Sequence, residues 1–139
     1  MFQYPAKFIK EDKFYSLKFI DIDAVTQGKT MEELLLNAQD ILSLVIEEDL
    51  KRNKEIPTPS KVYGENILYI QPYPEIGISL FLRHLRKESH LTQKQIAEKV
   101  NIPYQSYQKI ERGLRANITL KTLFKLAKAF EKKLIIDFK

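Results

Sequence analysis

The sequence predicts an α+β fold in two parts: a small domain of strands and one helix, then an all-helical domain that ends in a short strand. Near the N-terminus apolar residues alternate with a period of two, whereas in the C-terminal half they repeat at helical spacing. The charge also changes sign. Residues 1–71 carry 9 Lys and Arg against 12 Asp and Glu, and residues 72–139 carry 14 against 6. A basic C-terminal part favours a polyanionic partner.

The N-terminal elements follow from the alternation. Aromatic and apolar side chains at every second position of residues 2–8 predict a strand. A polar turn at residues 10–13 leads into a second strand over residues 14–20, and a short third strand at residues 24–27 is closed by Gly28.

A helix follows this strand group. Thr30 and Glu33 fit the two ends of a capping box, in which Glu33 accepts a hydrogen bond from the backbone N–H of Thr30. The charged residues 47–54 end the helix, and residues 66–71 read as a final strand, which gives the order ββ(β)αβ. The predicted buried face of the helix consists of Leu34, Leu35, Ala38, Ile41, Leu42 and Val45.

The segment Gln71-Pro72-Tyr73-Pro74 matches neither period, so we place a domain boundary there. The predicted organisation is a first domain of residues 1–71, a linker of residues 72–76 and a second domain of residues 77–139.

Four helices are predicted in the second domain. The first covers residues 75–89, with Ile78, Phe81, Leu82 and Leu85 facing inward. The second opens at Thr92 in a capping box with Gln95, and carries Ile96, Ala97 and Val100 on its inner face. The third covers residues 103–112 and stops at Gly113, and the fourth begins at Thr119. The predicted apolar face of the fourth helix consists of Leu120, Leu123, Phe124, Leu126, Ala127 and Phe130.

The run LRKESHLTQKQIAEKVNIPYQSYQKIERG resembles the helix-turn-helix of the phage repressor/Cro (Xre) family over roughly residues 77–131. Asn101, in the turn, accepts a positive φ at low cost. The resemblance implies that Arg86 pairs with Glu111. His90 stands where the family usually has Gly, and Tyr107 where it usually has a β-branched residue, which indicates an enlarged pocket or a hydroxyl that reaches the surface.

If the third helix lies in a major groove, its exposed N-terminal residues meet the base edges. The predicted base-reading residues are Tyr104, Gln105, Ser106, Gln108 and Lys109. The predicted phosphate contacts are Gln93, Arg112, Arg115 and Asn117. The alternative is that the polar residues of this helix form an ordinary solvated face.

Residues 133–138 have strand propensity but no predicted partner in a helical domain. One solution is a two-stranded ribbon with a second copy, which makes a two-fold dimer that reads a pseudo-palindrome. The alternative is that the segment folds back on the first domain. The predicted dimerisation residues are Leu134, Ile135, Ile136 and Phe138.

The first domain resembles the N-terminal domain of HicB-type antitoxins. The residues that carry the resemblance are Phe19 to Asp23, Thr26-Gln27-Gly28, Thr30 to Glu33 and Asn37-Ala38, although the family's Pro-Gly-Cys before the third strand is missing. The resemblance implies a truncated RNase H-like fold that binds and covers a small, basic mRNA-cleaving toxin of the HicA type. An acidic first domain suits such a partner.

An enzyme is the less favoured interpretation. RNase H-like folds can carry Mg²⁺-dependent nucleases, which need converging carboxylates. The candidates are Asp21, Asp23, Glu32, Glu33 and Asp40, but the helix dipole alone favours acids at a helix start. The chain has no cysteine and two histidines, which excludes thiolate metal sites, a cysteine nucleophile and a His-rich metal centre. We expect no metal, no cofactor and no catalytic residue.

The sequence therefore predicts an antitoxin that binds a HicA-type toxin, and that represses its own operon by binding operator double-stranded DNA as a homodimer or higher homo-oligomer. The alternative is a stand-alone repressor whose first domain senses a ligand or a protein. No signal peptide or membrane-spanning segment is recognised, so we expect a bacterial cytoplasmic protein that joins the nucleoid when bound to DNA.

Overall fold

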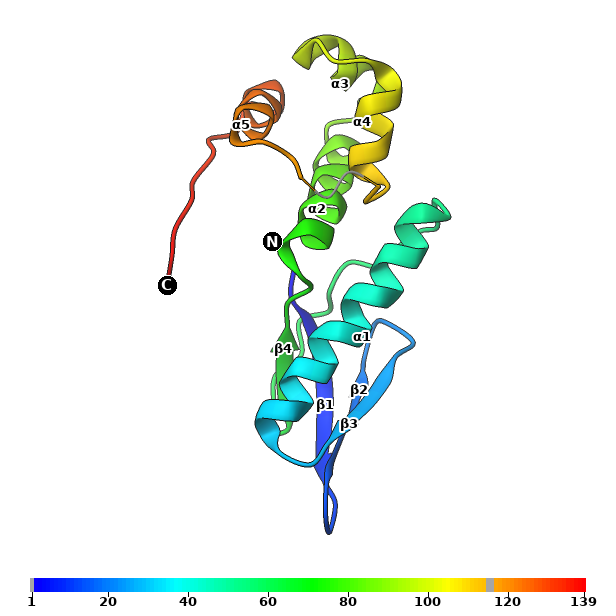
Figure 1. The fold of residues 1–139 in the computed structure, drawn as a ribbon, viewed down its shortest axis with the longest axis vertical. Helices are drawn as coiled ribbons and strands as arrows, with labels where there is room; N and C mark the ends of the chain where they lie inside the picture. The colour runs from blue at the N-terminus through cyan, green and yellow to red at the C-terminus, as the bar shows by residue number, and fades with distance from the viewer. Residues whose placement is uncertain (1, 115–116) are drawn as a thin grey trace. The chain divides into compact units, whose positions relative to one another are not determined.

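The computed structural model of the chain describes residues 2–114 and 117–139. It divides into two compact units, Met1–Ile78 and Ser79–Lys139. Within the described residues there are four strands and five helices, which confirms the mixed α+β class. In chain order they are β1 (Tyr4–Lys10), β2 (Tyr15–Phe19), β3 (Val25–Gly28), α1 (Met31–Lys51), β4 (Ile67–Ile70), α2 (Pro74–Glu88), α3 (Gln93–Val100), α4 (Tyr104–Glu111) and α5 (Leu120–Ala129) (Figure 1).

The four strands of the first unit form one antiparallel sheet in the order β3-β2-β1-β4. Ala6 lies opposite Phe19 on β2 and opposite Leu68 on β4, so these three side chains share one face. Tyr4, Ala6, Leu17 and Phe19 are buried on this face, and α1 covers it (Figure 1). The predicted alternation of the first two strands therefore does place a core on one side of the sheet.

Helix α1 packs through a stripe that differs from the predicted one. Every fourth residue from Leu34 to Leu50 is fully buried, whereas Leu35 is 41% exposed and Ile41 and Val45 are half-buried. Four residues turn an α-helix by slightly more than one full turn, so the buried stripe winds slowly around α1 and leaves Leu35 outside. The helix also continues to Lys51, through part of the charged run that was expected to end it.

The start of α1 is capped by one of the two predicted hydrogen bonds. The Thr30 hydroxyl accepts from the backbone N–H of Glu33, at 3.1 Å. The Glu33 carboxylate accepts from the backbone N–H of Lys29, at 3.4 Å, rather than from Thr30, so the prediction of a complete capping box is wrong here.

Gly28 ends β3 where the chain turns directly into α1. A Cβ atom at this position would lie 2.5 Å from the backbone nitrogen of Leu34 and 2.8 Å from its Cα. Only a residue without a side chain allows the strand and the first turn of the helix to approach this closely.

The segment after β4 is fastened to α1. Gln39 donates its side-chain amide to the carbonyl of Gln71, at 3.0 Å, and the Ser43 hydroxyl accepts from the backbone N–H of Tyr73, at 2.9 Å. The Tyr73 hydroxyl donates to Asp40. Helix α2 then begins at Pro74, so residues 74–76 of the predicted linker are helical, and the boundary between the two units falls after Ile78.

The core of the second unit is built from short helices. Ile96, Ala97 and Val100 of α3 are buried as predicted, and Tyr107 and Ile110 of α4 are fully buried. In the part of α2 that belongs to this unit Leu80 and Leu82 are buried, while Phe81 and Leu85 are only half-buried. Ile78, also predicted to face inward, is half-buried and is the last residue of the first unit. Leu126 of α5 and Phe130, directly after this helix, are buried, but Leu120 and Phe124, predicted on the same face, are 63% and 52% exposed.

The predicted C-terminal strand is not formed in the single chain. Residues 132–139 have no regular secondary structure. Leu134 is half-buried, whereas Ile135, Ile136 and Phe138 are 76%, 57% and 96% exposed. A strand is stabilised by hydrogen bonds to a neighbouring strand. In the predicted ribbon that neighbour is the same segment of a second copy, which a single chain does not contain.

Gly28→Ala should lower the free energy of unfolding by about 1–3 kcal/mol, because the added methyl group collides with the backbone of α1. The matched control is Gly64→Ala, whose Cβ would meet only the Ile67 side chain, at 3.5 Å. Urea denaturation followed by circular dichroism measures both. Equal stability of the two variants would contradict the close approach.

Candidate nucleic-acid interface

Two helices and the turn between them form the centre of the second unit. At the start of α3 the Thr92 hydroxyl accepts from the backbone N–H of Gln95, at 3.1 Å, and the Gln95 side chain accepts from the backbone N–H of Thr92, at 2.8 Å. The second predicted capping box is thus complete. Asn101 ends α3 in the left-handed region, at φ 57°, and the backbone N–H of Ile102 returns to the carbonyl of Ala97.

Helix α4 begins immediately after Pro103, whose missing N–H is harmless at a helix start. One side of α4 is buried through Tyr107, Ile110 and Glu111. The predicted base-reading residues lie on its other side: Tyr104, Gln105 and Lys109 are exposed, and Ser106 and Gln108 are half-buried. The helix therefore presents a polar face rich in hydrogen-bond donors and acceptors.

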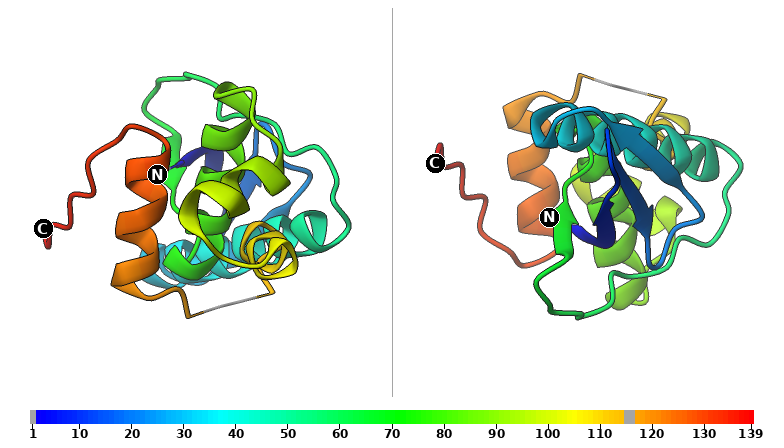
Figure 2. Two further views of the ribbon diagram at one scale, coloured as in Figure 1. Left: turned by 90° about the horizontal axis from the view of Figure 1, so that it is seen from above. Right: turned by 90° about the horizontal axis from the view of Figure 1, so that it is seen from below.

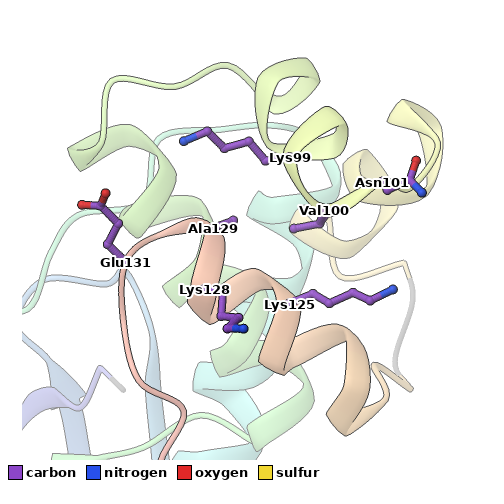
Figure 3. A pocket seen from close by; sticks show the side chains of 7 residues that line it. All are labelled: Lys99, Val100, Asn101, Lys125, Lys128, Ala129 and Glu131. Carbon is purple, nitrogen blue, oxygen red and sulfur yellow. The ribbon is translucent and has the colours of Figure 1, made fainter.

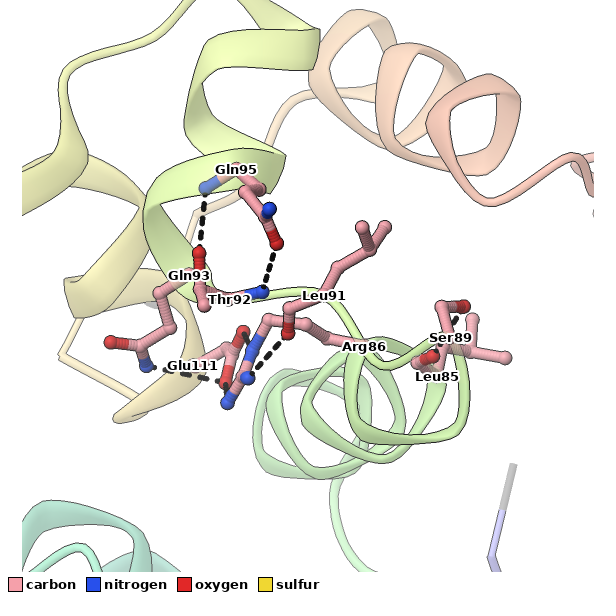
Figure 4. Close-up of polar contacts among 8 residues, drawn as sticks. All are labelled: Leu85, Arg86, Ser89, Leu91, Thr92, Gln93, Gln95 and Glu111. Atoms are coloured by element: carbon pink, nitrogen blue, oxygen red, sulfur yellow. Dashed lines mark hydrogen bonds and ion pairs between the residues drawn. The ribbon is translucent and has the colours of Figure 1, made fainter.

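A buried ion pair fixes α4 against α2 (Figure 4). The Arg86 guanidinium donates through Nε to Glu111 Oε2, at 2.6 Å, and through Nη2 to Glu111 Oε1, at 3.0 Å. Its Nη1 donates to the carbonyl of Leu91, at 3.0 Å, in the loop before α3. Glu111 is 1% exposed, so Arg86 joins α2 to α4 and to the loop before α3 through charge-assisted hydrogen bonds away from water.

The surroundings of Arg86 keep its guanidinium charged. Burial lowers the pKa of Arg86, but the hydrogen bonds and the charge of Glu111 act in the opposite direction, and the pKa ends above its ordinary value. Since Arg86 loses its proton only above that raised pKa, the ion pair contributes to stability throughout the neutral range.

Gln93 belongs to the same cluster. Its side-chain amide donates to Glu111 Oε1, at 3.3 Å, so in this structure the residue predicted to contact phosphate links the first turn of α3 to the end of α4. Among the other predicted phosphate contacts, Arg112 is half-buried directly after α4 and Asn117 is exposed. Arg115 lies outside the described residues.

The two departures from the repressor/Cro pattern are both accommodated. His90 adopts φ 54° after α2, in the left-handed region that Gly usually supplies. Tyr107 is fully buried, so its ring fills an enlarged pocket and does not reach the surface. Burial, followed by the nearby Glu111 charge, raises the pKa of Tyr107, and no described residue accepts a hydrogen bond from its hydroxyl.

Three of the five carboxylates considered for nuclease chemistry, Asp21, Glu33 and Asp40, accept hydrogen bonds within the first unit. Both oxygens of Asp21 accept from Ser60, one from its backbone N–H at 2.8 Å and the other from its hydroxyl. Glu33 and Asp40 accept from Lys29 and Tyr73. Within the described residues no three His, Asp or Glu side chains gather closely enough to hold a metal ion, and no helix there is long and apolar enough to cross a membrane.

Comparisons with known proteins address both units. A family model described as the HicB-like antitoxin of bacterial toxin-antitoxin systems matches residues 3–72, and a helix-turn-helix model matches residues 82–135. The chain belongs to the HicB-like antitoxin family. Its second unit adds the helix-turn-helix of a DNA-binding protein, so the chain combines an antitoxin domain with a DNA-binding domain.

Named relatives of this family extend across both domains. Antitoxin HicB 1 of Photorhabdus laumondii subsp. laumondii is 30% identical over 128 residues, which cover 91% of this chain and 80% of the relative. Antitoxin HicB 2 of the same organism is 29% identical over 109 residues, 78% of this chain and 76% of the relative. Antitoxin HicB of Escherichia coli is 28% identical over 92 residues, 66% of each chain.

The sequence predicted the Arg86–Glu111 pair but not the backbone carbonyl that completes its hydrogen-bond cluster. The Leu91 carbonyl accepts from Arg86 and is as much a member of the cluster as Glu111, but a carbonyl leaves no signal in the residue pattern. It also missed the exposed leucines of α1, Leu36 and Leu44, which are 56% and 54% exposed. The sequence could have indicated their exposure, because both leucines lie outside the predicted buried face of that helix.

Glu111→Gln should lower the free energy of unfolding of the second unit by about 3–5 kcal/mol, because it leaves the Arg86 charge buried without a counter-charge. The control is Glu88→Gln, which removes the partner of His84 on the surface of α2, where Glu88 is 62% exposed. That change should stay within about 1 kcal/mol. Chemical denaturation of the full chain tests both, and a loss of equal size in the two variants would argue against a special role for the buried pair.

Proposed function

We propose that this antitoxin represses its own operon by inserting α4 into the major groove of operator DNA as a dimer, and that its first unit neutralises a HicA-type, mRNA-cleaving toxin by direct binding. The observation that carries the DNA-binding part is the exposed polar face of α4, held in place by the buried contact of Arg86 and Glu111. An isolated helix of eight residues is not stable in water, so contacts with the protein interior must stabilise α4 and fix its orientation.

Base reading would come from the exposed and half-buried side chains on the polar face of α4. Gln105 and Gln108 can each pair bidentately with adenine, and Lys109 can donate to guanine. Tyr104, which is 42% exposed, can pack its ring on a thymine methyl group or donate to a phosphate, and Ser106 can bond to several base edges.

Most of the affinity would come from the backbone of the DNA. Lys and Arg outnumber Asp and Glu by 14 to 5 in residues 79–139, which favours binding to a polyanion. Arg112, Arg115 and Asn117 follow α4 directly and would contact phosphates there. Gln93 would reach phosphate from the first turn of α3, and to do so its amide would exchange Glu111 for the DNA.

Dimer formation would use the C-terminal segment. Ile135, Ile136 and Phe138 are large apolar side chains that stand mostly in solvent, and half-buried Leu134 belongs to the same run. Such a group of exposed apolar residues typically marks a protein contact. A two-fold dimer would place two copies of α4 on half-sites about 34 Å apart.

Toxin binding would use the first unit, Met1–Ile78, which contains the predicted toxin-binding domain of residues 1–71 with its expected truncated RNase H-like fold. The solvent side of α1 carries Leu36 and Leu44 in the open, four residues on either side of Asp40. Glu33, Glu47 and Glu48 lie on the same side of the helix. Exposed leucines surrounded by acidic residues complement a basic protein surface. The family resemblance implies that the toxin is basic.

The test is co-expression with the small reading frame next to this gene. Toxicity of that product alone, relief by the full chain and a stable complex of the two would support the antitoxin function. A harmless neighbour that does not bind would leave a stand-alone repressor with a sensing domain.

Replacements on α4 should separate base reading from phosphate binding. Gln105→Ala should narrow the difference in affinity between operator and scrambled DNA, by about 1–3 kcal/mol for a lost bidentate contact. Arg112→Ala should weaken both DNAs equally and lower the slope of log K against log salt by about 1. Fluorescence anisotropy across a salt series measures both effects. If the two variants behave alike, the assigned face of α4 is wrong.

Charge introduced on α1 should disrupt the toxin complex. Leu36→Glu together with Leu44→Glu should abolish relief of toxicity while leaving DNA binding unchanged, because the acids remove apolar contact from an exposed helix face. The control is Val25→Glu, which changes a residue that is 64% exposed, on the sheet face away from α1. Loss of neutralisation in the control as well would point to a different surface.

A further inference from the structure

The second unit has a surface pocket between the C-terminal ends of α3 and α5 to which the proposed DNA binding assigns no role (Figure 3). Its volume is about 490 Å³, within the range in which proteins hold other molecules. Val100 and Ala129 form its apolar part, and Lys99, Lys125 and Lys128 surround them. Lysine adds both a charge and an apolar stem to such a wall.

The lysines of this pocket can form cation–π contacts with an aromatic ring and ion pairs with a carboxylate. Lys128 places its ammonium group 5.2 Å from the centre of the Phe124 ring, so one cation–π contact already exists on this surface. None of the described residues forms an ion pair with Lys99 or Lys125. A segment that fits here would therefore combine apolar and aromatic side chains with a carboxylate.

The C-terminal segment of the chain has this composition. Phe138 is 96% exposed and Ile136 is 57% exposed, and between them stands Asp137, the single Asp of residues 79–139. In an extended chain Ile136 and Phe138 point to one side and Asp137 to the other. The apolar pair can enter the pocket while the carboxylate stays at the level of the lysine ammonium groups.

The segment cannot easily enter the pocket of its own chain. Glu131 itself lines the pocket, so the segment starts at the rim, and seven extended residues carry Phe138 roughly 23 Å away. A return would need a tight turn, but residues 132–136 contain no Gly, Pro, Asn, Asp or Ser, and the single Asp of the segment, Asp137, stands next to Phe138. Figure 2 shows the segment leading away from α5.

We propose that the pocket between α3 and α5 of one copy receives residues 134–138 of a second copy. Phe138 packs on Val100, Ala129 and the lysine stems, and Asp137 pairs with Lys125. A two-fold axis makes the contact reciprocal, so each dimer contains it twice. This inference rests on the dimerisation part of the proposed function and replaces the pairing of two C-terminal strands by docking of each segment in the other copy's pocket.

The direct test is photo-crosslinking of the full chain with p-benzoylphenylalanine at position 138, in an equal mixture of isotope-labelled and unlabelled protein. Mass spectrometry should find position 138 joined to a peptide containing residues 125–131 of the other copy. Crosslinks between the two C-terminal segments, or within one chain, would overturn the proposal. The same reagent at position 63, where Tyr63 is 82% exposed in the first unit, controls for unspecific reaction.

A charge exchange gives an independent test. Lys125→Glu and Asp137→Lys should each weaken dimerisation roughly tenfold or more, and the double variant should recover most of the loss because the pair is restored with reversed polarity. Lys121→Glu, an equal charge change on the same helix at a residue that does not line the pocket, should leave the dimer intact. Sedimentation equilibrium measures all four proteins. Failure of the double variant to recover would contradict the pairing of these two residues.

The outcome of these experiments can be distinguished from a failure of the proposed function. Toxin relief and binding of a single operator half-site do not need the pocket, so both should survive in Lys125→Glu, whereas cooperative binding to a full operator should be lost. If the chain does not bind DNA or toxin at all, crosslinking and sedimentation still report whether the segment docks in the pocket.

Discussion

The second unit depends on one buried contact, the forked pairing of Arg86 with Glu111. Helices α3 and α4 have eight residues each, below the length at which an isolated helix is stable in water. Their directions must come from tertiary contacts. Arg86 binds the end of α4 through a rigid planar group and also binds the Leu91 carbonyl, so one side chain sets the angle between α2, the loop and α4. The exposed face of α4 inherits its direction from this contact.

The first unit achieves a similar result with backbone geometry. The absence of a side chain at Gly28 brings β3 against the first turn of α1, and three hydrogen bonds fasten the exit from β4 to the middle of the same helix. The start of α1 is thus held against β3, and its middle is held to the segment after β4. These two attachments fix α1 on one face of the sheet. Its other side is then free to carry Leu36 and Leu44 among acidic residues, an arrangement that has no role in the core.

Local signals predicted nearly all of the secondary structure. Caps at Thr30, Thr92 and Thr119 and turns at Asn101 and Gly113 mark helix ends through contacts only a few residues apart, so the sequence records them directly. The faces of α1 and α5 were predicted less well, since burial of Leu35 or Phe124 depends on how a neighbouring element lies across the helix. The Arg86–Glu111 pair came from family resemblance, because 25 residues separate its members. The lysine-lined pocket had no sequence signal, since lysines at helix ends read as ordinary surface.

Each of the helices α2, α3, α4 and α5 is followed within two residues by one with left-handed backbone: His90, Asn101, Gly113 and Glu131. Only one is glycine, and the left-handed conformation costs about 1–2 kcal/mol for most other residues, less for Asn. For a small domain this is a noticeable share of a net stability of about 5–15 kcal/mol. A molecule that binds only the folded form raises that stability in proportion to the logarithm of its concentration. Binding of DNA to the folded form of this unit would therefore offset part of this cost.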